Sequence, residues 1–191
     1  MASDASASSF DQIGGLRGRT VIVTGGAGPL GSVLSRAFAA CGSRVVIVDL
    51  PHAKPAAIAE SINATYGTGA RGVACDLGNE QSLRNAAASI VEQGPVHALV
   101  NNAAFTGTSA ASGWAVPFEK QEASLWRLAI EINLTAPFLL TQALLPALRA
   151  AGSASVVNIS SIYGLVGPDW SIYQDTSLGN PAAYAASKGG S

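Results

Sequence analysis

The chain is poor in charged, aromatic and sulfur-containing residues. Of its 191 residues, 12% are charged and 6% are aromatic, and the formal net charge is −1. So little excess charge gives no electrostatic basis for binding nucleic acid or an anionic membrane surface, and we expect neither partner. Hydrophobic residues make up 48% of the chain. This balance favours an α/β domain whose sheet is covered on both faces, or a subunit that buries surface in a homo-oligomer.

Cysteine occurs only twice, at Cys41 and Cys75. Their predicted places, at the end of a helix and of a strand, favour buried free thiols over a disulfide, and we expect no metal site. No apolar run is long enough to cross a bilayer. The first residues have neither a basic region nor an apolar segment, so no secretory signal is expected. We expect a disordered tail over 1–15, one domain over 16–191 and a cytoplasmic protein.

The clearest local pattern lies in residues 20–49. A β-branched run leads into a glycine-rich turn and then into a helical pattern, which Gly42 is placed to end. A second apolar run follows and stops at Asp49. This order predicts one βαβ unit with parallel strands.

Three glycines in this turn have the spacing Gly-x-x-Gly-x-x-Gly, which suits a dinucleotide. Gly25 allows a sharp turn after the strand, Gly28 leaves room for a pyrophosphate, and Gly31 lets the helix lie close to the strand. The N–H groups at the helix start would face the anion. Asp49 would accept hydrogen bonds from the adenosine ribose and repel a 2′-phosphate, which favours NAD over NADP.

Strand and helix patterns alternate along the rest of the chain. We expect helices over 54–66, 79–93 and 123–150, the last kinked or broken at Pro137 or Pro146, and strands over 69–75, 96–100 and 154–159. The fold class is therefore α/β, with a doubly wound, Rossmann-like parallel sheet. Ligands of such sheets bind beyond the carboxyl ends of the strands, where the polar clusters that follow the strands would converge.

A tyrosine and a lysine mark the last predicted helix. Tyr184 and Lys188 are four residues apart and so share one face, and Asn180 and Pro181 suit the cap and first turn of this helix. The ammonium would stabilise the phenolate, and such a tyrosine can exchange a proton with a substrate hydroxyl or carbonyl. Ser161, at the end of the neighbouring strand, could hydrogen-bond the same oxygen.

Six motifs in this order resemble those of the short-chain dehydrogenase/reductase superfamily, in its compact single-domain branch. They are TGGAGPLG at 24–31, Asp76-Leu77, NNAA at 101–104, Asn133 within EINLTAPF, NISS at 158–161 and YAASK at 184–188. The resemblance implies that Ser161 polarises the substrate oxygen and that Tyr184 is the general acid/base. Lys188 would hold the nicotinamide ribose, and Asn133 would hold a water in a proton relay with Lys188.

The resemblance also implies roles in the adenosine half of a cofactor site. Asp76 and Leu77 would lie at the adenine and Asn102 near the adenosine-side ribose, whereas Asn101 is expected to bracket two strands. The expected catalytic residues are therefore Asn133, Ser161, Tyr184 and Lys188, and the expected cofactor-binding residues are Gly25, Gly28, Leu30, Gly31, Asp49, Asp76, Leu77, Asn102, Tyr184 and Lys188.

Three features depart from the pattern of the compact branch. The glycine spacing is that of the extended branch, which includes nucleotide-sugar epimerases, and Pro29 has no N–H to donate to a phosphate. Ser161 and Tyr184 are 23 positions apart, so an extra segment at about 167–179 is expected beside the substrate. Its aromatic and acidic residues suit a polyol or sugar, and a plain surface loop is the alternative.

The chain stops shortly after Lys188, so we expect a fragment without the C-terminal strands and helix, with weak or no turnover.

Three functions fit these patterns. The first is an NAD-dependent oxidoreductase that interconverts a secondary alcohol and a carbonyl, both small molecules, by hydride transfer at C4 of nicotinamide. The second is a nucleotide-sugar epimerase or dehydratase that keeps NAD bound and leaves the net NADH level unchanged. The third is a catalytically silent nucleotide-binding protein, whose NAD binding would be unaffected by Tyr184→Phe and which would show no turnover.

Overall fold

The structure is a computed structural model, and it describes residues 15–107 and 112–190. The tail expected over 1–15 lies outside the described residues, apart from Gly15. Within the described part, helices and strands alternate along the chain, as the sequence predicted.

Five parallel strands form one sheet in the spatial order β3-β2-β1-β4-β5. The strands are β1 (Thr20–Thr24), β2 (Arg44–Asp49), β3 (Arg71–Ala74), β4 (Ala98–Asn101) and β5 (Ser155–Asn158). This confirms the predicted doubly wound parallel sheet. The chain first adds strands on one side of β1 and then on the other, so the order reverses between β1 and β4. Such a reversal opens a crevice at the carboxyl ends of the strands.

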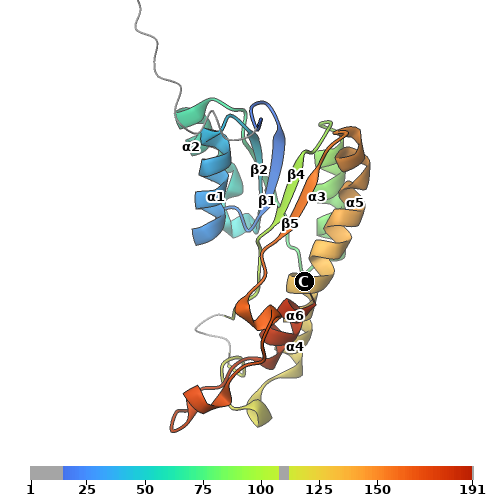
Figure 1. Cartoon of the computed structure of the whole chain (residues 1–191). Helices are drawn as coiled ribbons and strands as arrows, with labels where there is room; N and C mark the ends of the chain where they lie inside the picture. Colours follow the sequence, from blue (N-terminus) through green and yellow to red (C-terminus); the bar gives the residue numbers. More distant parts are fainter. Residues whose placement is uncertain (1–14, 108–111, 191) are drawn as a thin grey trace, which may run out of the picture.

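Helices cover both faces of the sheet (Figure 1). Helices α1 (Pro29–Ala40) and α2 (Pro55–Tyr66) lie on one face, and α3 (Glu80–Val91) and α5 (Ala136–Ala150) lie on the other. Because side chains alternate across a strand, Val21 and Val23 pack in the core under α1 and α2, whereas Ile22 packs in the core under α3 and α5. Both cores are apolar, which explains why the central strands β1 and β2 read as continuous hydrophobic runs.

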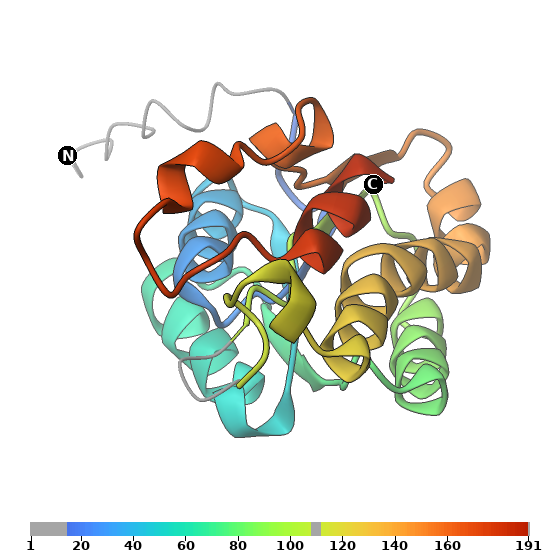
Figure 2. The same cartoon turned by 90° about the horizontal axis from the view of Figure 1, so that it is seen from below.

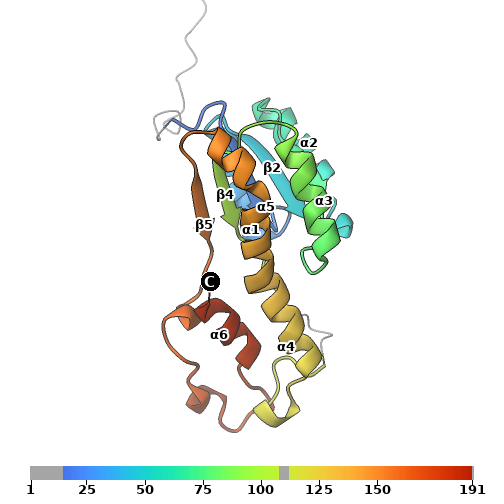
Figure 3. The same cartoon turned by 90° about the vertical axis from the view of Figure 1, so that its right-hand side faces the viewer.

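The helix predicted over 123–150 is continuous but contains one irregular turn (Figure 3). Helix α4 (Ala123–Ile130) passes into a π turn, η4 (Glu131–Thr135), and then into α5. The irregularity therefore precedes the first proline, Pro137, which lies in the first turn of α5. Pro146 lies inside α5, which remains helical through it.

By length and composition alone, the helix Ala123–Ala150 could cross a membrane, with a mean hydropathy of 1.5 over 18 residues. The expectation that no apolar segment is long enough is therefore wrong. The reason for its apolar character lies in the fold, because Leu140 and Leu144 are buried in the core against Leu83 of α3. The part of Ala123–Ala150 that packs in the core is therefore α5, and 28% of the 18-residue apolar window is buried.

Helix α6 (Ala182–Gly189) and α4 lie beyond the carboxyl ends of the strands, and Figure 2 views the molecule from that side. Three short 3₁₀ turns accompany them, namely η3 (Phe118–Lys120), η5 (Ile162–Gly164) and η6 (Trp170–Tyr173). The cap predicted at Asn180 is wrong. Pro181 occupies the cap position, and the Asn180 side chain instead donates to the Tyr173 hydroxyl at 3.3 Å.

Candidate active site

The turn between β1 and α1 is closely packed at Gly25 and Gly31, where neighbouring backbone leaves no room for a side chain. Gly25 has a φ of 62°, in the left-handed region that glycine adopts readily. A Cβ added at Gly31 would lie 2.0 Å from the Gly25 carbonyl oxygen, whereas one added at Gly28 would meet only that oxygen, at 3.3 Å. Gly31 is therefore needed for helix–strand packing, and Gly28 leaves an open surface above the turn.

Pro29 does not impair the start of α1. It is the first residue of the helix, where its missing N–H would have no partner within the helix, and Gly28 is the cap residue. Leu30 and Gly31 are the next two residues, and N–H groups in the first turn of a helix point outward without intrahelical acceptors. These two N–H groups can face an anion at the helix N-terminus.

Asp49 connects the end of β2 to the glycine turn. Its Oδ2 accepts a hydrogen bond from the Ala27 N–H at 2.9 Å, and its Oδ1 accepts one from the Leu50 N–H at 2.8 Å. The carboxylate thus fixes the turn as well as facing the cavity. Its place at the end of the strand next to β1 is the one that the sequence predicted.

The two asparagines after β4 have different structural partners. The Asn101 Nδ2 donates to the Asn158 Oδ1 at 2.8 Å, which confirms the predicted bracket between β4 and β5. The Asn102 Nδ2 donates to the Thr24 carbonyl oxygen at 2.9 Å, and the Asn102 backbone N–H donates to the Thr24 hydroxyl at 3.0 Å. Asn102 therefore holds the end of β1 at the point where the glycine turn begins.

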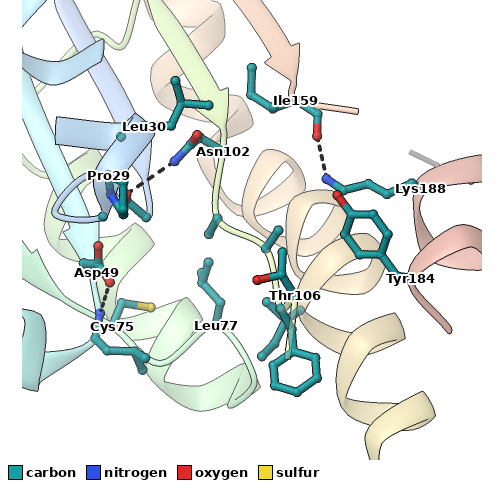
Figure 4. A pocket seen from close by; sticks show the side chains of 18 of the residues that line it. Pro29, Leu30, Asp49, Cys75, Leu77, Asn102, Thr106, Ile159, Tyr184 and Lys188 are labelled. Carbon is teal, nitrogen blue, oxygen red and sulfur yellow. Dashed lines mark hydrogen bonds between the residues drawn. The ribbon is translucent and has the colours of Figure 1, made fainter. Parts of the chain in front are cut away.

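One cavity of about 470 Å³ lies along the carboxyl ends of the strands (Figure 4). Ten of the predicted site residues line it: Gly25, Gly28, Leu30, Gly31, Asp49, Asp76, Leu77, Asn102, Tyr184 and Lys188. The structure thus brings together residues from the glycine turn, the ends of β2 and β3, the segment after β4, and α6. Their binding roles stay predictions.

Cys75 also lines the cavity and is 1% exposed. Burial raises the pKa of its thiol, although a hydrogen bond from the Ser82 hydroxyl, with an O···S distance of 3.8 Å, acts in the opposite direction. A buried thiol of this kind stays protonated and unreactive near neutral pH. Both cysteines are free in the described structure, and Cys75 is buried as predicted, whereas Cys41 is only partly buried.

Tyr184 and Lys188 lie together at the opposite end of the cavity from Asp49 (Figure 4). The Lys188 Nζ lies 6.0 Å from the centre of the Tyr184 ring and donates to the Ile159 carbonyl oxygen at 2.6 Å. Lys188 is 4% exposed, and burial lowers the pKa of its ammonium. The pair therefore combines a phenol and a buried cation on one face of α6, as their spacing predicted.

Asn133 lies in the π turn, is 2% exposed and does not line the cavity. Its Oδ1 accepts from the Phe105 N–H at 2.6 Å, and its Nδ2 donates to the Phe105 carbonyl oxygen at 3.1 Å and to the Ser187 hydroxyl at 3.0 Å. The side chain therefore joins the segment after β4 to α6. The predicted role in a proton relay is not tested by these contacts.

Ser161 is not among the residues that line the cavity, whereas its neighbour Ser160 is. The Ser161 hydroxyl oxygen accepts from the Tyr163 N–H at 3.3 Å and so caps η5. The Ser160 hydroxyl donates to the Lys188 carbonyl oxygen at 3.2 Å. The structure thus places Ser160 beside α6, and the predicted polarising role of Ser161 stays a prediction.

Tyr163 of η5 lies next to Tyr184 of α6, and Tyr173 of the extra segment interacts with Tyr163. The Tyr163 ring meets the Tyr184 ring edge-on, with centroids 6.3 Å apart and an interplanar angle of 88°. Partial burial and the neighbouring Tyr173 raise the pKa of Tyr163. No residue of 167–179 lines the described cavity, so the expectation that this segment shapes a substrate pocket stays untested.

The sequence reading missed several residues of this site. Phe105, Thr106, Ile132 and Ile159 line the cavity, and all of them lie within or directly after a predicted motif. Phe105 and Thr106 directly follow NNAA, so continuing that motif along the chain would have found them. Gln121 contacts the start of α6 from a segment with no motif, and no local signal indicated it.

The chain belongs to the short chain dehydrogenase family, whose profile matches residues 19–191. It is 39% identical over 179 residues to a trans-4-hydroxycyclohexanecarboxylate dehydrogenase of Sinomonas cyclohexanicum, covering 90% of this chain and 62% of that protein. It is 31% identical to a D-threitol dehydrogenase of Mycolicibacterium smegmatis, covering 92% of this chain and 61% of that protein. The chain therefore spans about three fifths of the length of these relatives.

A solved structure from Escherichia coli CFT073, described as a short chain dehydrogenase in complex with NADPH, has the same fold. Its TM-score is 0.76 at 27% identity, and the match covers 92% of this chain and 68% of that one. Membership of this family agrees with the Rossmann-like fold of the described residues. Because that neighbour holds NADPH, the fold alone does not decide between NAD and NADP.

Proposed function

We propose that the protein is an NAD-dependent dehydrogenase that interconverts a secondary alcohol and a carbonyl. The observation that carries the proposal is the cavity itself, which has the glycine turn and Asp49 at one end and Tyr184 and Lys188 at the other. The first end fits an adenosine diphosphate, because Gly28 has no side chain and the first N–H groups of α1 point outward. The second end supplies a proton-transfer group.

The chemistry follows from the side chains around Tyr184. During oxidation its phenolate oxygen would accept the proton of the substrate hydroxyl, and during reduction the phenol would return it. The Lys188 ammonium would stabilise the phenolate and hold the nicotinamide ribose. NAD, when bound, supplies the nicotinamide C4 that takes or gives the hydride. The roles of Ser161 in polarising the substrate oxygen and of Asn133 in proton relay rest on the family motifs.

The names of the two relatives point to a substrate class. One is named for a ring-borne secondary alcohol and the other for a small polyol, so we propose a cyclic alcohol or polyol as substrate. The test incubates the protein, in the form that the cell makes, with NAD⁺ and each member of a panel of cyclohexanols, tetritols and aldoses. We expect NADH to accumulate with at least one member, whereas product formation without NADH would favour the epimerase alternative.

The preference for NAD is proposed from the charge of Asp49. Asp49→Asn keeps an oxygen acceptor for the Ala27 N–H but removes the negative charge that would repel a 2′-phosphate. We expect the ratio of the NADPH to the NADH dissociation constant to fall roughly tenfold, equivalent to about 1.4 kcal/mol. Fluorescence titration with both cofactors measures this ratio.

Asp49→Ala is the companion variant, because it removes both the charge and the hydrogen bond to the turn. We expect it to weaken NADH binding as well as to relax the discrimination. An unchanged cofactor ratio in Asp49→Asn would show that Asp49 does not set the preference.

A further inference from the structure

The side chain of Gln121, outside the cavity, makes hydrogen bonds to the start of α6. The Gln121 Oε1 accepts from the Ala182 N–H at 2.9 Å, and its Nε2 donates to the Asn180 carbonyl oxygen at 2.8 Å and to the Val116 carbonyl oxygen at 3.1 Å. Both ends of the amide are thus used. Gln121 directly follows η3 and precedes α4, so these bonds tie α6 to a segment 61 residues earlier in the chain.

Helix α6 needs such an external partner. Its cap residue, Pro181, provides no side-chain acceptor for the N–H groups of the first turn. The Gln121 Oε1 takes the place of the missing cap.

The same junction is tightly packed around the Gln121 bonds. A Cβ added at Gly179 would lie 2.4 Å from the Val116 carbonyl oxygen, and the Gly179 N–H donates to the Ala115 carbonyl oxygen at 3.3 Å. The backbone just before α6 therefore lies directly against the loop that leads to Gln121. The far end of α6 is held separately, by the bond between Asn133 and Ser187.

We propose that Gln121 is a positioning residue for Tyr184. Tyr184 lies two residues after Ala182, in the first turn of α6, so the bonds that fix this turn also fix the place of the phenol at the end of the cavity. Lys188 lies one turn further along, nearer the end that Asn133 holds. Gln121 does not line the cavity and acts only through α6. The kinetic part of this inference rests on the proposed function, whereas its structural part does not.

The first test is hydrogen exchange on the full 191-residue chain. Gln121→Ala removes all three bonds, and we expect the amides of 182–189 to exchange at least about tenfold faster while those of β1 and β2 stay within about twofold. Gln121→Glu keeps an oxygen that can accept from the Ala182 N–H, but it has no N–H to donate to the carbonyl oxygens of Asn180 and Val116. We therefore expect the amides of 182–189 to exchange faster than in the wild type, but by less than in Gln121→Ala. Gln81→Ala is the control, because Gln81 lies on the exposed side of α3 and donates to Asn85 at 2.9 Å.

The second test is a double-mutant cycle in the protein as the cell makes it. Gln121→Ala should lower kcat roughly ten- to a hundredfold with little change in the NADH dissociation constant, because a misplaced phenol slows proton transfer. In a Tyr184→Phe background the same change should lower kcat by less than about twofold. If Gln121 had only a structural role, the fold losses in kcat from Gln121→Ala and Tyr184→Phe would instead multiply in the double variant.

The outcomes separate the two proposals. Unchanged exchange in α6 in both Gln121 variants, or multiplicative kinetic losses, would overturn the positioning role. If Tyr184→Phe retains full turnover, the proposed acid/base chemistry fails, and faster exchange in α6 would still establish Gln121 as the anchor of this helix.

Discussion

Replacing Tyr184 by phenylalanine is expected to lower kcat/KM by about 10²- to 10⁴-fold, the range that general acid–base groups contribute. The substitution removes one oxygen and keeps the ring that meets Tyr163 edge-on. It also leaves the Lys188 bond to the Ile159 carbonyl oxygen in place. Steady-state kinetics with the best substrate from the alcohol panel, together with NADH titration, would measure the effect.

Cofactor binding should change little in this variant, by less than about threefold, because the glycine turn and Asp49 are far along the cavity from α6. Tyr66→Phe is the matched control, since Tyr66 ends α2 on the surface and does not line the cavity. Turnover at the wild-type rate in Tyr184→Phe would mean that another group transfers the proton.

Two glycine-to-alanine substitutions three residues apart, at positions 28 and 31, should have different effects on stability and on NADH binding. Gly31→Ala would force a Cβ to within 2.0 Å of the Gly25 carbonyl oxygen, so the turn must open. We expect a loss of about 2–3 kcal/mol in the free energy of unfolding, as in overpacked cores, and loss of NADH binding. Chemical denaturation and fluorescence titration measure the two effects.

Gly28→Ala isolates the effect on binding. Gly28 has a φ of −73°, which alanine adopts without strain, and its added Cβ would meet only the Gly25 carbonyl oxygen, at 3.3 Å. We expect the free energy of unfolding to change by less than about 1 kcal/mol, but NADH affinity to fall roughly 10- to 100-fold as the methyl group occupies the pyrophosphate surface. Normal NADH affinity in Gly28→Ala would place the cofactor elsewhere.

The parts of the fold predicted from the sequence are those coded by local patterns. The run before Gly25, the glycine spacing and the acid at Asp49 predicted the first βαβ unit, because each depends on neighbouring residues only. The same holds for Tyr184 and Lys188, whose four-residue spacing places them together on any helix.

The parts that were missed depend on contacts between distant segments. The cap expected at Asn180 failed because Gln121, far away in the sequence, supplies the acceptor for Ala182. The site of the helix irregularity was assigned to prolines, whereas the structure has a π turn before Pro137, where Asn133 reaches Phe105 and Ser187. Neither partner of Asn133 is adjacent in the sequence, so spacing alone could not indicate this turn.

The π turn Glu131–Thr135 also has a consequence for insertions and deletions. A π turn accommodates one more residue than an α-helical turn, so α4 and α5 are out of phase by about 100°, the rotation per residue of an α-helix. Deleting one residue here would leave an unbroken helix but turn Ala129, which packs with Ala183 of α6, away from its partner. Residue number, as well as residue identity, is therefore constrained in this stretch of the chain.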